Sequence, residues 1–490
     1  MTARRAVLLG GGCAMYVCFS AVALAMALWC ACAVSAEPGS QMPQYRPPDT
    51  SVADARGAGL RPRLLVLTDI GGDPDDQQSM IRLMAFANEF DIEGLIASAS
   101  GTPGELKKEI TQPHLIRQIV EACGKVLPNL RQHAEGYPPA EELIAKIKSG
   151  NPHRGWKNVG DAHDTEGSQW IVQAGMRDDP RPLNIVIWGG QTDLAQALWR
   201  VRADRGEDGL RRFIGKLRIY DINDQDGIAE RMWQAFPGMF YILAKAPPGV
   251  DRREGAYRGM YLGGDISLTS RQWIDEHVRV GHGPLGELYP TRTWTAPNPH
   301  STLKEGDTPS WFYFLPNGLS DSEHPDWGGW GGRFMRDANG IWRDARDTVA
   351  GETSARATVW RWRPHFQAHF QARMDWCVRP PGQANHAPLA VCNGDRTRNV
   401  LRLEARPGQT VRLSAAGSTD PDGHKISFRW WVYREAGTYA NDVPIDGAST
   451  PEASIAAPAD AGADIHVVLE VSDDGAPPLT SYRRVILQVR

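Results

Sequence analysis

The stretch that decides the fold is Leu67-Thr68-Asp69-Ile70-Gly71-Gly72-Asp73-Pro74-Asp75-Asp76. It follows the apolar run RLLVLTD and leads into DDQQSMIRLMAFANEF, a pattern that predicts a buried strand joined to an amphipathic helix. Carboxylates this close together repel one another unless a cation or a helix dipole compensates. The glycines let the backbone turn tightly, so that the carboxylate oxygens can converge.

Two interpretations of these aspartates stay open. Asp73 as N-cap, Pro74 at the first helical position, and Asp75 and Asp76 in the first turn would make a good helix start without any function. Capping does not explain Asp69, which lies at the end of the strand. We favour a site for a hard cation, because Mg²⁺ and Ca²⁺ bind several clustered oxygen ligands.

Strand and helix patterns alternate along the chain from Arg61 to about residue 300. This predicts an α/β domain with a mostly parallel sheet, helices on both faces, and a ligand site at the carboxyl ends of the strands. The last part of the chain has short alternating runs separated by Pro, Gly and Asp turns, which predict an all-β immunoglobulin-like sandwich. The expected segments are a signal peptide (1–36), a flexible leader (37–60), the α/β domain (61–345), a helical connector and linker (346–385) and the sandwich (386–490).

The first residues have the pattern of a secretory signal. Arg4 and Arg5 precede a long apolar run, and Val34-Ser35-Ala36 is typical of a cleavage site. The run could also remain as a single anchor helix. We favour cleavage, and therefore expect a secreted or periplasmic protein without a stable membrane anchor. The formal net charge of −4 becomes more negative when the two arginines leave, which argues against nucleic acid as a partner.

Three cysteines remain after the signal. Cys377 and Cys392 are close enough in sequence to pair in an oxidising compartment, whereas Cys123 lies alone on an apparent helix and is best interpreted as a buried thiol.

The aspartate segment resembles the signature of the nucleoside hydrolases, in which an Asp at the end of the first strand is followed by an adjacent Asp pair. It is closer still to a secreted branch described as cellulose-binding proteins with a nucleoside hydrolase-like domain. That branch shares further segments with this chain, namely TEGS (Thr165–Ser168), WGGQTD (Trp188–Asp193), EGDTPS (Glu305–Ser310), PDWGGWGGRF (Pro325–Phe334) and STDPDG (Ser418–Gly423).

The resemblance implies an exported, Ca²⁺-dependent hydrolase that cleaves an N- or O-glycosidic bond in carbohydrate metabolism. Asp69 would be a Ca²⁺ ligand and the base that activates the attacking water. Asp76 would chelate Ca²⁺, and Asp75 would hydrogen-bond the sugar hydroxyls. Thr192 would offer its backbone carbonyl and Asp307 its carboxylate as further ligands. The partner would be a carbohydrate or ribosyl-type small molecule, with cellulose as a further candidate.

The chain also departs from the nucleoside hydrolases. The turn between Asp69 and Asp75 is longer, Gly306 stands where they have a histidine that helps the base leave, and Ser98-Ala99-Ser100 replaces an asparagine after the second strand. Loss of the histidine favours an alternative, a non-catalytic cellulose- or carbohydrate-binding protein that keeps the fold, whereas retention of all five metal and sugar positions favours the enzyme.

Other polar residues are weaker candidates for the site. Asn223, Gln225 and Asp226 follow a strand and could contact a sugar, although such residues also form turns. Glu166 either caps a helix or faces the pocket. His324 is a candidate for the missing acid. By contrast, the helical spacing of His365 and His369 favours packing or surface positions over a metal site, because the intervening Glu of a zinc protease is absent.

The sequence is rich in tryptophan, with 17 residues against 12 each of Tyr and Phe. Trp327 and Trp330 follow Asp307, so we expect them to wall the sugar site. Later members of the cluster should join the α/β domain to the sandwich, since large aromatic side chains dominate interface burial. These are Trp360, Trp362 and Trp376.

Two acidic segments of the sandwich are interpreted as turns. They are Asp420-Pro421-Asp422-Gly423 and Asp473-Asp474-Gly475, with a structural Ca²⁺ as the alternative. Trp430 and Trp431 should point to opposite faces of a strand, one into the core and the other toward a sugar or the neighbouring domain.

Overall fold

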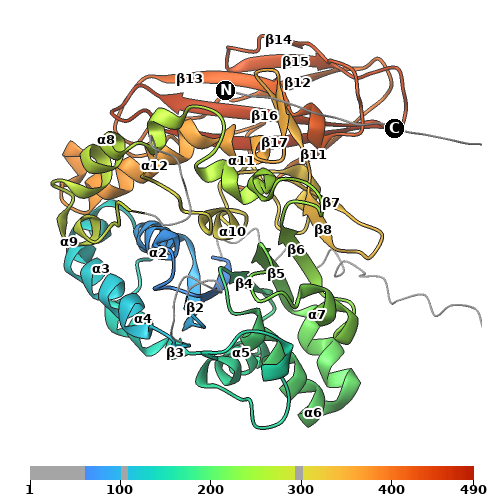
Figure 1. The fold of residues 1–490 in the computed structure, drawn as a ribbon. Helices are drawn as coiled ribbons and strands as arrows, with labels where there is room; N and C mark the ends of the chain where they lie inside the picture. Colours follow the sequence, from blue (N-terminus) through green and yellow to red (C-terminus); the bar gives the residue numbers. More distant parts are fainter. Residues whose placement is uncertain (1–60, 101–108, 293–301) are drawn as a thin grey trace, which may run out of the picture. The chain divides into compact units, whose positions relative to one another are not determined.

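A computed structural model describes residues 61–100, 109–292 and 302–490 of the chain (Figure 1). The predicted signal peptide and leader lie outside these residues. Within the described part, no helix has both the length and the apolar character that a bilayer crossing needs.

An eight-stranded sheet forms the centre of the first domain, in the order β3-β2-β1-β4-β5-β6-β8-β7. Its neighbouring strands run parallel, except that β7 pairs antiparallel with β8. The prediction of a mostly parallel sheet is therefore confirmed. The strands are β1 (Arg63–Thr68), β2 (Asp91–Ala97), β3 (Ile147–Ser149), β4 (Leu183–Ile187), β5 (Leu217–Ile222), β6 (Phe240–Ala244), β7 (Phe334–Arg336) and β8 (Trp342–Asp344).

Helices cover both faces of this sheet, because successive side chains of a strand point to opposite sides. Leu64 and Val66 of β1 belong to a core with residues of α2 (Asp75–Ala85) and α3 (Pro113–His133), whereas Leu65 and Leu67 belong to a second core with residues of α5 and α6 (Figure 1). The further helices of the described chain are α4 (Ala140–Ala145), α5 (Glu166–Met176), α6 (Gln191–Gly215), α7 (Ala229–Ala235), α8 (Arg271–Ile274), α9 (Gly283–Glu287), α10 (Thr308–Phe312), α11 (Ala357–Trp360) and α12 (Arg363–Trp376).

The central position of β1 brings three strand ends together. The Ser98 N–H, after β2, donates to Thr68 O at 2.8 Å, and the Trp188 N–H, after β4, donates to Leu67 O at 2.8 Å. Asp69 therefore lies between the segments that leave β2 and β4. This is the edge where parallel sheets bind ligands.

A buried ion pair holds α2 against the segment that leads into α10. Arg82 Nε lies 2.5 Å from Glu305 Oε2, and both side chains are fully buried. Tyr289 and Thr308 donate hydroxyl hydrogen bonds to the same carboxylate at 2.6 and 2.9 Å, and the Arg82 guanidinium lies 3.8 Å from the centre of the Phe370 ring. Both oxygens of Glu305 thus have partners, which is the condition for burying a charge without large cost.

The C-terminal region consists of two packed sheets, with the orders β11-β17-β16-β13 and β12-β15-β14. A short pair, β9 (Asp347–Val349) with β10 (Glu352–Ser354), precedes it. Pairing in the two sheets is antiparallel apart from β11 with β17. The strands are β11 (Leu401–Ala405), β12 (Thr410–Ser414), β13 (Ile426–Val432), β14 (Ile445–Asp446), β15 (Glu452–Ala456), β16 (Asp464–Asp473) and β17 (Thr480–Val489).

Aromatic side chains join the two regions. The Trp362 ring is 1% exposed, and its centre lies 5.8 Å from that of Trp431. The centres of the Tyr433 and Tyr482 rings lie 6.0 and 5.8 Å from that of Trp362. Trp430, by contrast, lies in the core of the sandwich. The predicted roles of Trp362 and of the Trp430-Trp431 pair are confirmed.

His365 and His369 lie at the junction with the sandwich, whereas Trp360 packs within the first domain. His365 Nδ1 lies 2.5 Å from Tyr482 Oη and His369 Nε2 lies 2.9 Å from Thr480 O, so both histidines pack against the sandwich, as expected. Trp360 differs from the prediction, because its ring packs against the backbone of residues 263–264 in the first domain.

Cys123, Cys377 and Cys392 are all buried free thiols. The expected pairing of Cys377 with Cys392 is corrected, because Cys377 lies in the core of the first domain and Cys392 in that of the sandwich. The interpretation of Cys123 as a free buried thiol is confirmed, and burial raises its pKa to about 12.

We expect Trp362→Ala to lower the free energy of unfolding by about 3–5 kcal/mol, because it leaves a cavity among buried aromatic rings. Urea denaturation followed by far-UV circular dichroism measures the change. Trp199→Ala is the matched control: this indole is half-buried on α6, and its loss should cost clearly less. Equal losses for the two variants would contradict an energetic role of the junction.

Candidate functional site

Four predicted aspartates lie together at the carboxyl end of β1. Asp69 follows the strand, Asp75 and Asp76 begin α2, and Asp307 directly precedes α10. One carboxylate oxygen from each of Asp75, Asp76 and Asp307 lies within 4.8 Å of the others. Gly189 permits the close approach of Asp69, since a Cβ at this position would lie 2.6 Å from the Asp69 Cγ.

Burial dominates the electrostatics of this cluster. It raises the pKa of Asp76 and Asp307 well above the ordinary range, and repulsion from the neighbouring carboxylates raises both further. Burial also raises the pKa of Asp75 to about 6, although the Lys304 ammonium opposes the rise. The pKa of Asp69 is raised by burial too, against the opposing effect of Arg154.

Two basic side chains, Lys304 and Arg154, contact these carboxylates. The sequence patterns did not indicate either of them. Lys304 Nζ contacts the Asp73 carboxylate and lies 3.5 Å from Asp75 Oδ2. Arg154 Nη2 lies 2.6 Å from Asp69 Oδ2. Lys304 could have been noticed as a lone cation just before Asp307, but Arg154 comes from a loop without any periodic pattern.

The capping interpretation of Asp73 is wrong. Helix α2 begins at Asp75 with Pro74 as its N-cap, and no side chain caps it. Asp73 instead pairs with Lys304, because a buried ion pair competes successfully with a local hydrogen bond.

The residues present fit a hard divalent cation. The donors are carboxylate oxygens, and Asp307 Oδ2 is buried without a hydrogen-bond partner among the described residues. The Thr68 hydroxyl donates to Asp76 Oδ1, which orients that carboxylate. A buried carboxylate oxygen without a partner calls for an ion or water, and several clustered oxygens suit Ca²⁺ or Mg²⁺.

Thr192 and Asp226 lie beside this group. Asp226 Oδ2 accepts hydrogen bonds from the Thr192 N–H and hydroxyl at 2.8 and 2.6 Å. Asp226 Oδ1 lies 4.0 Å from Arg154 Nε, so Arg154 connects Asp226 with Asp69. The Thr192 hydroxyl also accepts a hydrogen bond from the Gly155 N–H at 2.8 Å.

Asn223 and Gln225, which follow β5 in the same loop as Asp226, contact the protein backbone. Gln225 donates its side-chain amide to the Trp188 carbonyl, next to Gly189. Asn223 has a φ of 72° and its N–H donates to Ala244 O at 3.0 Å, as a turn residue does.

Asp193 is a buried residue whose contacts the sequence did not indicate. Its carboxylate accepts hydrogen bonds from the Ser98 hydroxyl at 2.7 Å, the Asn151 N–H at 2.8 Å and the Thr165 hydroxyl at 2.9 Å. Burial raises its pKa to about 6. Asp193 thereby ties together the ends of β2 and β4 and the start of α5.

Glu166 lies outside the candidate site. Its side chain is 57% exposed and lies 3.1 Å from Lys148 Nζ. The cap of α5 is Thr165, which forms a capping box with Ser168. Both alternatives for Glu166 are thus corrected, because the helix already has its cap and the carboxylate faces solvent.

His324, Trp327 and Trp330 belong to the junction with the sandwich, and this replaces their predicted contacts with a sugar. The His324 and Trp327 rings stack with centres 3.8 Å apart, and Arg484 Nη1 donates to the Trp327 carbonyl at 2.6 Å. Trp330 Nε1 donates to Tyr482 Oη at 3.2 Å. Burial lowers the pKa of His324. Trp327 and Trp330 are only 6% and 2% exposed. Their burial in the junction is favourable because large aromatic side chains remove much apolar surface from water.

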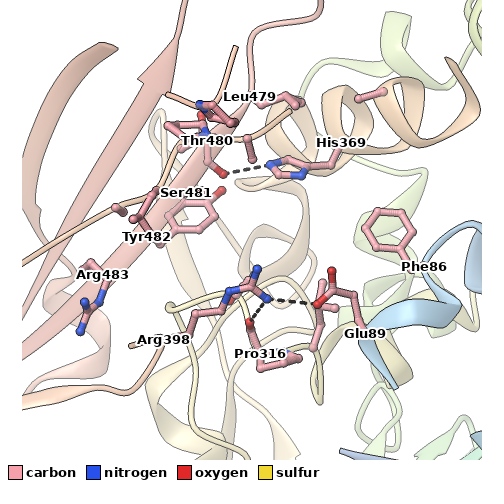
Figure 2. A pocket seen from close by; sticks show the side chains of 18 of the residues that line it. Phe86, Glu89, Pro316, His369, Arg398, Leu479, Thr480, Ser481, Tyr482 and Arg483 are labelled. Atoms are coloured by element: carbon pink, nitrogen blue, oxygen red, sulfur yellow. Dashed lines mark hydrogen bonds and ion pairs between the residues drawn. The ribbon is translucent and has the colours of Figure 1, made fainter. Parts of the chain in front are cut away.

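A cavity of about 420 Å³ lies at this junction, away from the aspartates (Figure 2). Its wall includes Glu89, which lies 3.1 Å from Arg398 Nη1, and His369, which contacts the Thr480 carbonyl. The rings of Trp330 and Tyr482 also line it, but each residue is only 2% exposed. These rings therefore offer no open face for a polysaccharide.

Gly306 has a physical explanation. A Cβ at this position would lie 3.2 Å from Asp75 Oδ2 and 3.3 Å from the Tyr257 ring. A side chain at this position would therefore press on Asp75 and on the Tyr257 ring, and burial keeps the Tyr257 hydroxyl protonated by raising its pKa.

Comparisons with known proteins agree with this architecture. Residues 63–334 match the family model of the cellulose-binding Sde182 nucleoside hydrolase-like domain, and residues 410–489 match that of the C-terminal domain of cellulose-binding protein Sde0182. No curated protein matches the chain.

The chain is also similar to solved structures. One of them is a nucleoside hydrolase-related hypothetical protein from Saccharophagus degradans, which is described as associated with carbohydrate metabolism. It is 33% identical to this chain, with a TM-score of 0.73, and the match covers 88% of this chain and 100% of that protein. The PKD domain from KIAA 1837 protein is 21% identical over 19% of this chain and 81% of its own, with a TM-score of 0.15. This chain therefore belongs to the Sde182 family of cellulose-binding proteins with a nucleoside hydrolase-like domain.

Proposed function

We propose that this protein is a Ca²⁺-dependent hydrolase of a glycosidic bond in a carbohydrate or ribosyl-type substrate. The observation that carries the proposal is the convergence of Asp75, Asp76 and Asp307, of which the last two are buried, with the buried Asp69 beside them. Concentrating negative charge in this way destabilises the folded protein, and binding a divalent cation would offset the cost. Helix capping does not account for the arrangement.

Calcium is the cation we propose for this group, because all the donors are oxygens. Asp76 and Asp307 would hold it, with Asp69 beside them and Thr192 as a weaker candidate ligand. A bound Ca²⁺ would supply Lewis-acid polarisation and a fixed point for orienting the substrate.

Asp69 is the residue we assign as general base. Its raised pKa makes it a stronger base than an ordinary aspartate, and the Arg154 contact at 2.6 Å holds its carboxylate in one orientation. Asp226 orients Arg154 in turn. Asp75, whose side chain is 16% exposed, is open enough to accept a hydrogen bond from a sugar hydroxyl.

The leaving group cannot be assisted by the histidine that serves this purpose in the nucleoside hydrolases. Gly306 carries no side chain, and the nearby Tyr257 keeps its proton. Substrates whose leaving groups depart without strong acid assistance are therefore the best candidates, and nitrophenyl glycosides meet this requirement.

We expect turnover of a nitrophenyl glycoside or nucleoside by the wild-type protein, and a loss of about 10²- to 10⁴-fold in kcat/KM for Asp69→Asn, because the amide cannot accept the proton from water. A panel of such substrates, assayed with Ca²⁺ and with EDTA, measures this.

Glu166→Gln is the matched control for this experiment. It makes the same change of carboxylate to amide on an exposed side chain, so the rate should stay unchanged. Turnover that is equal in Asp69→Asn and wild type would contradict the assignment of the base.

A second candidate function is non-catalytic carbohydrate binding. Gly306 favours it, since this position has no imidazole to assist departure of a leaving group and is tightly packed against Asp75 and Tyr257. Retention on insoluble cellulose, combined with no turnover of any substrate in the panel, would support the binder and exclude the hydrolase. We further propose a secreted location, on the support of the predicted signal and the cellulose-binding family.

We expect Ca²⁺ to stabilise the protein, and Asp76→Asn to remove the equivalent of Ca²⁺ bound by the first domain. At a concentration a hundred times Kd, one bound ion would add about 2.7 kcal/mol to the free energy of unfolding. Isothermal titration calorimetry and thermal unfolding measure the two effects. Unchanged stoichiometry and affinity in Asp76→Asn would contradict this site.

The raised pKa values predict a pH dependence with a defined sign. Asp75, with a pKa of about 6, and Asp76 and Asp307, raised further, bind more protons in the folded than in the unfolded state. In EDTA, lowering the pH from 8 to 6 should therefore increase the contribution of this cluster to stability, by about 1–3 kcal/mol.

Comparison of wild type with Asp76→Asn isolates this contribution from that of other titrating groups. The gain on acidification should be smaller in the variant, and saturating Ca²⁺ should reverse it in the wild type, because the ion binds the deprotonated carboxylates. Urea denaturation at each pH measures the difference. Parallel pH profiles of the two proteins in EDTA would contradict the electrostatic interpretation.

A further inference from the structure

Three segments meet at one end of the sandwich. In the sheet, Asp473 of β16 pairs with Ile426 of β13, which places the loop before β13 next to the end of β16. The His386 N–H donates to Asp422 Oδ2 at 2.7 Å and brings the linker to the same place. The segments are Asn385–His386, Asp420–His424 and Asp473–Gly475.

The loop before β13 contains a group with the geometry of a metal site. One ligand atom from each of Asp420, Asp422 and His424 lies within 4.8 Å of the others. The Asp420 side chain is 1% exposed. Its Oδ1 accepts the N–H groups of Asp422 and His424 at 2.9 and 3.0 Å, whereas its Oδ2 is buried with no hydrogen-bond partner among the described residues.

A second observation comes from the two other segments. Asn385 and Asp473 are 3% and 5% exposed, and Asn385 Nδ2 donates to Asp473 Oδ1 at 2.9 Å. The remaining oxygens, Asn385 Oδ1 and Asp473 Oδ2, are buried and have no hydrogen-bond partner within the described chain. The Asp474 N–H donates to Lys425 O at 3.1 Å and the Lys425 N–H donates to Asp474 Oδ1 at 3.0 Å, so the residue after Asp473 contacts the loop that carries Asp420.

These unpaired oxygens need a compensating positive charge. Leaving buried polar atoms without partners costs about 1–3 kcal/mol each, and more for charged groups. Within the described residues, Asp422 pairs with His386 at 2.9 Å and Asp420 with His424 at 3.6 Å, but no Lys or Arg pairs with Asp420, Asp422 or Asp473. Turn formation explains Asp420 Oδ1, but it does not explain why oxygens from three separate segments are buried without partners.

We propose that Asp420, Asp422, Asp473 and Asn385 bind a divalent cation, and that Ca²⁺ is the ion, because carboxylate and amide oxygens are its preferred ligands. The site is separate from the aspartates of the first domain and does not depend on the proposed activity. His424 Nδ1 is also buried without a hydrogen-bond partner, so Zn²⁺ is the competitor to test.

The position of this site connects it with the packing of the two regions. The Trp376 indole N–H donates to Asn385 O at 2.9 Å. His133, at the end of α3, stacks on Trp376 with ring centres 5.0 Å apart and contacts His386 at 2.9 Å. The cation would therefore fix the linker against the sandwich at the point where the linker also contacts the first domain.

The test uses the full chain carrying Asp76→Asn, so that Ca²⁺ bound by the first domain does not contribute. After EDTA treatment, calorimetric titration with CaCl₂ should give about one equivalent bound. Adding Asp420→Asn or Asp473→Asn should raise Kd by at least about tenfold, whereas Asp446→Asn, an exposed carboxylate of β14, should leave it unchanged. Titrations with MgCl₂ and ZnCl₂ determine the selectivity.

Terbium luminescence gives a second measurement that does not require the Asp420 and Asp473 variants to fold. Tb³⁺ at this site should be sensitised by Trp376, and Ca²⁺ should displace it from the otherwise unaltered Asp76→Asn chain. Absence of Ca²⁺ binding to that chain, equal Kd values with and without Asp420→Asn, or binding of Zn²⁺ but not Ca²⁺ would each overturn the proposal. If only the first-domain site is wrong, wild type binds one equivalent and Asp420→Asn removes it.

Discussion

The buried ion pair between Arg82 and Glu305 is the interaction on which the candidate site depends. Arg82 lies on the helix that carries Asp75 and Asp76, and Glu305 lies two residues before Asp307. Four acidic groups at the end of β1 would otherwise move apart, since burial strengthens their repulsion. The ion pair holds the two segments together from outside the cluster. The carboxylates of the cluster therefore converge although Arg82 neutralises none of them.

The local part of this arrangement could be predicted from the sequence. Strand β1, the glycine turn and α2 follow one another within a short stretch, and the periodicity of their apolar residues indicates both elements. The carboxylates of Asp69, Asp75 and Asp76 converge because they belong to that stretch. Asp307 is remote in sequence, and only the family resemblance indicated it before the fold brought it to the same point.

The remaining contacts could not be predicted, because they depend on partners distant in sequence. Asp73 has every local feature of a helix cap, yet Lys304, more than 200 residues later, takes its carboxylate. Trp327 and Trp330 follow the last aspartate closely, but the burial of their rings against the sandwich decides where they lie. The domain junction thus accounts for part of the tryptophan excess, whereas Trp188 and Trp311 belong to the core of the first domain. Sequence proximity to a site is a poor guide for large aromatic side chains.

The contact between Tyr257 and Gly306 couples these two positions. A side chain at position 306 would press on the Tyr257 ring and on Asp75, so both neighbours would have to shift by a few tenths of an ångström. The free-energy cost of a histidine at position 306 should therefore depend on which residue occupies position 257, and the effects of substitutions at the two positions should not add.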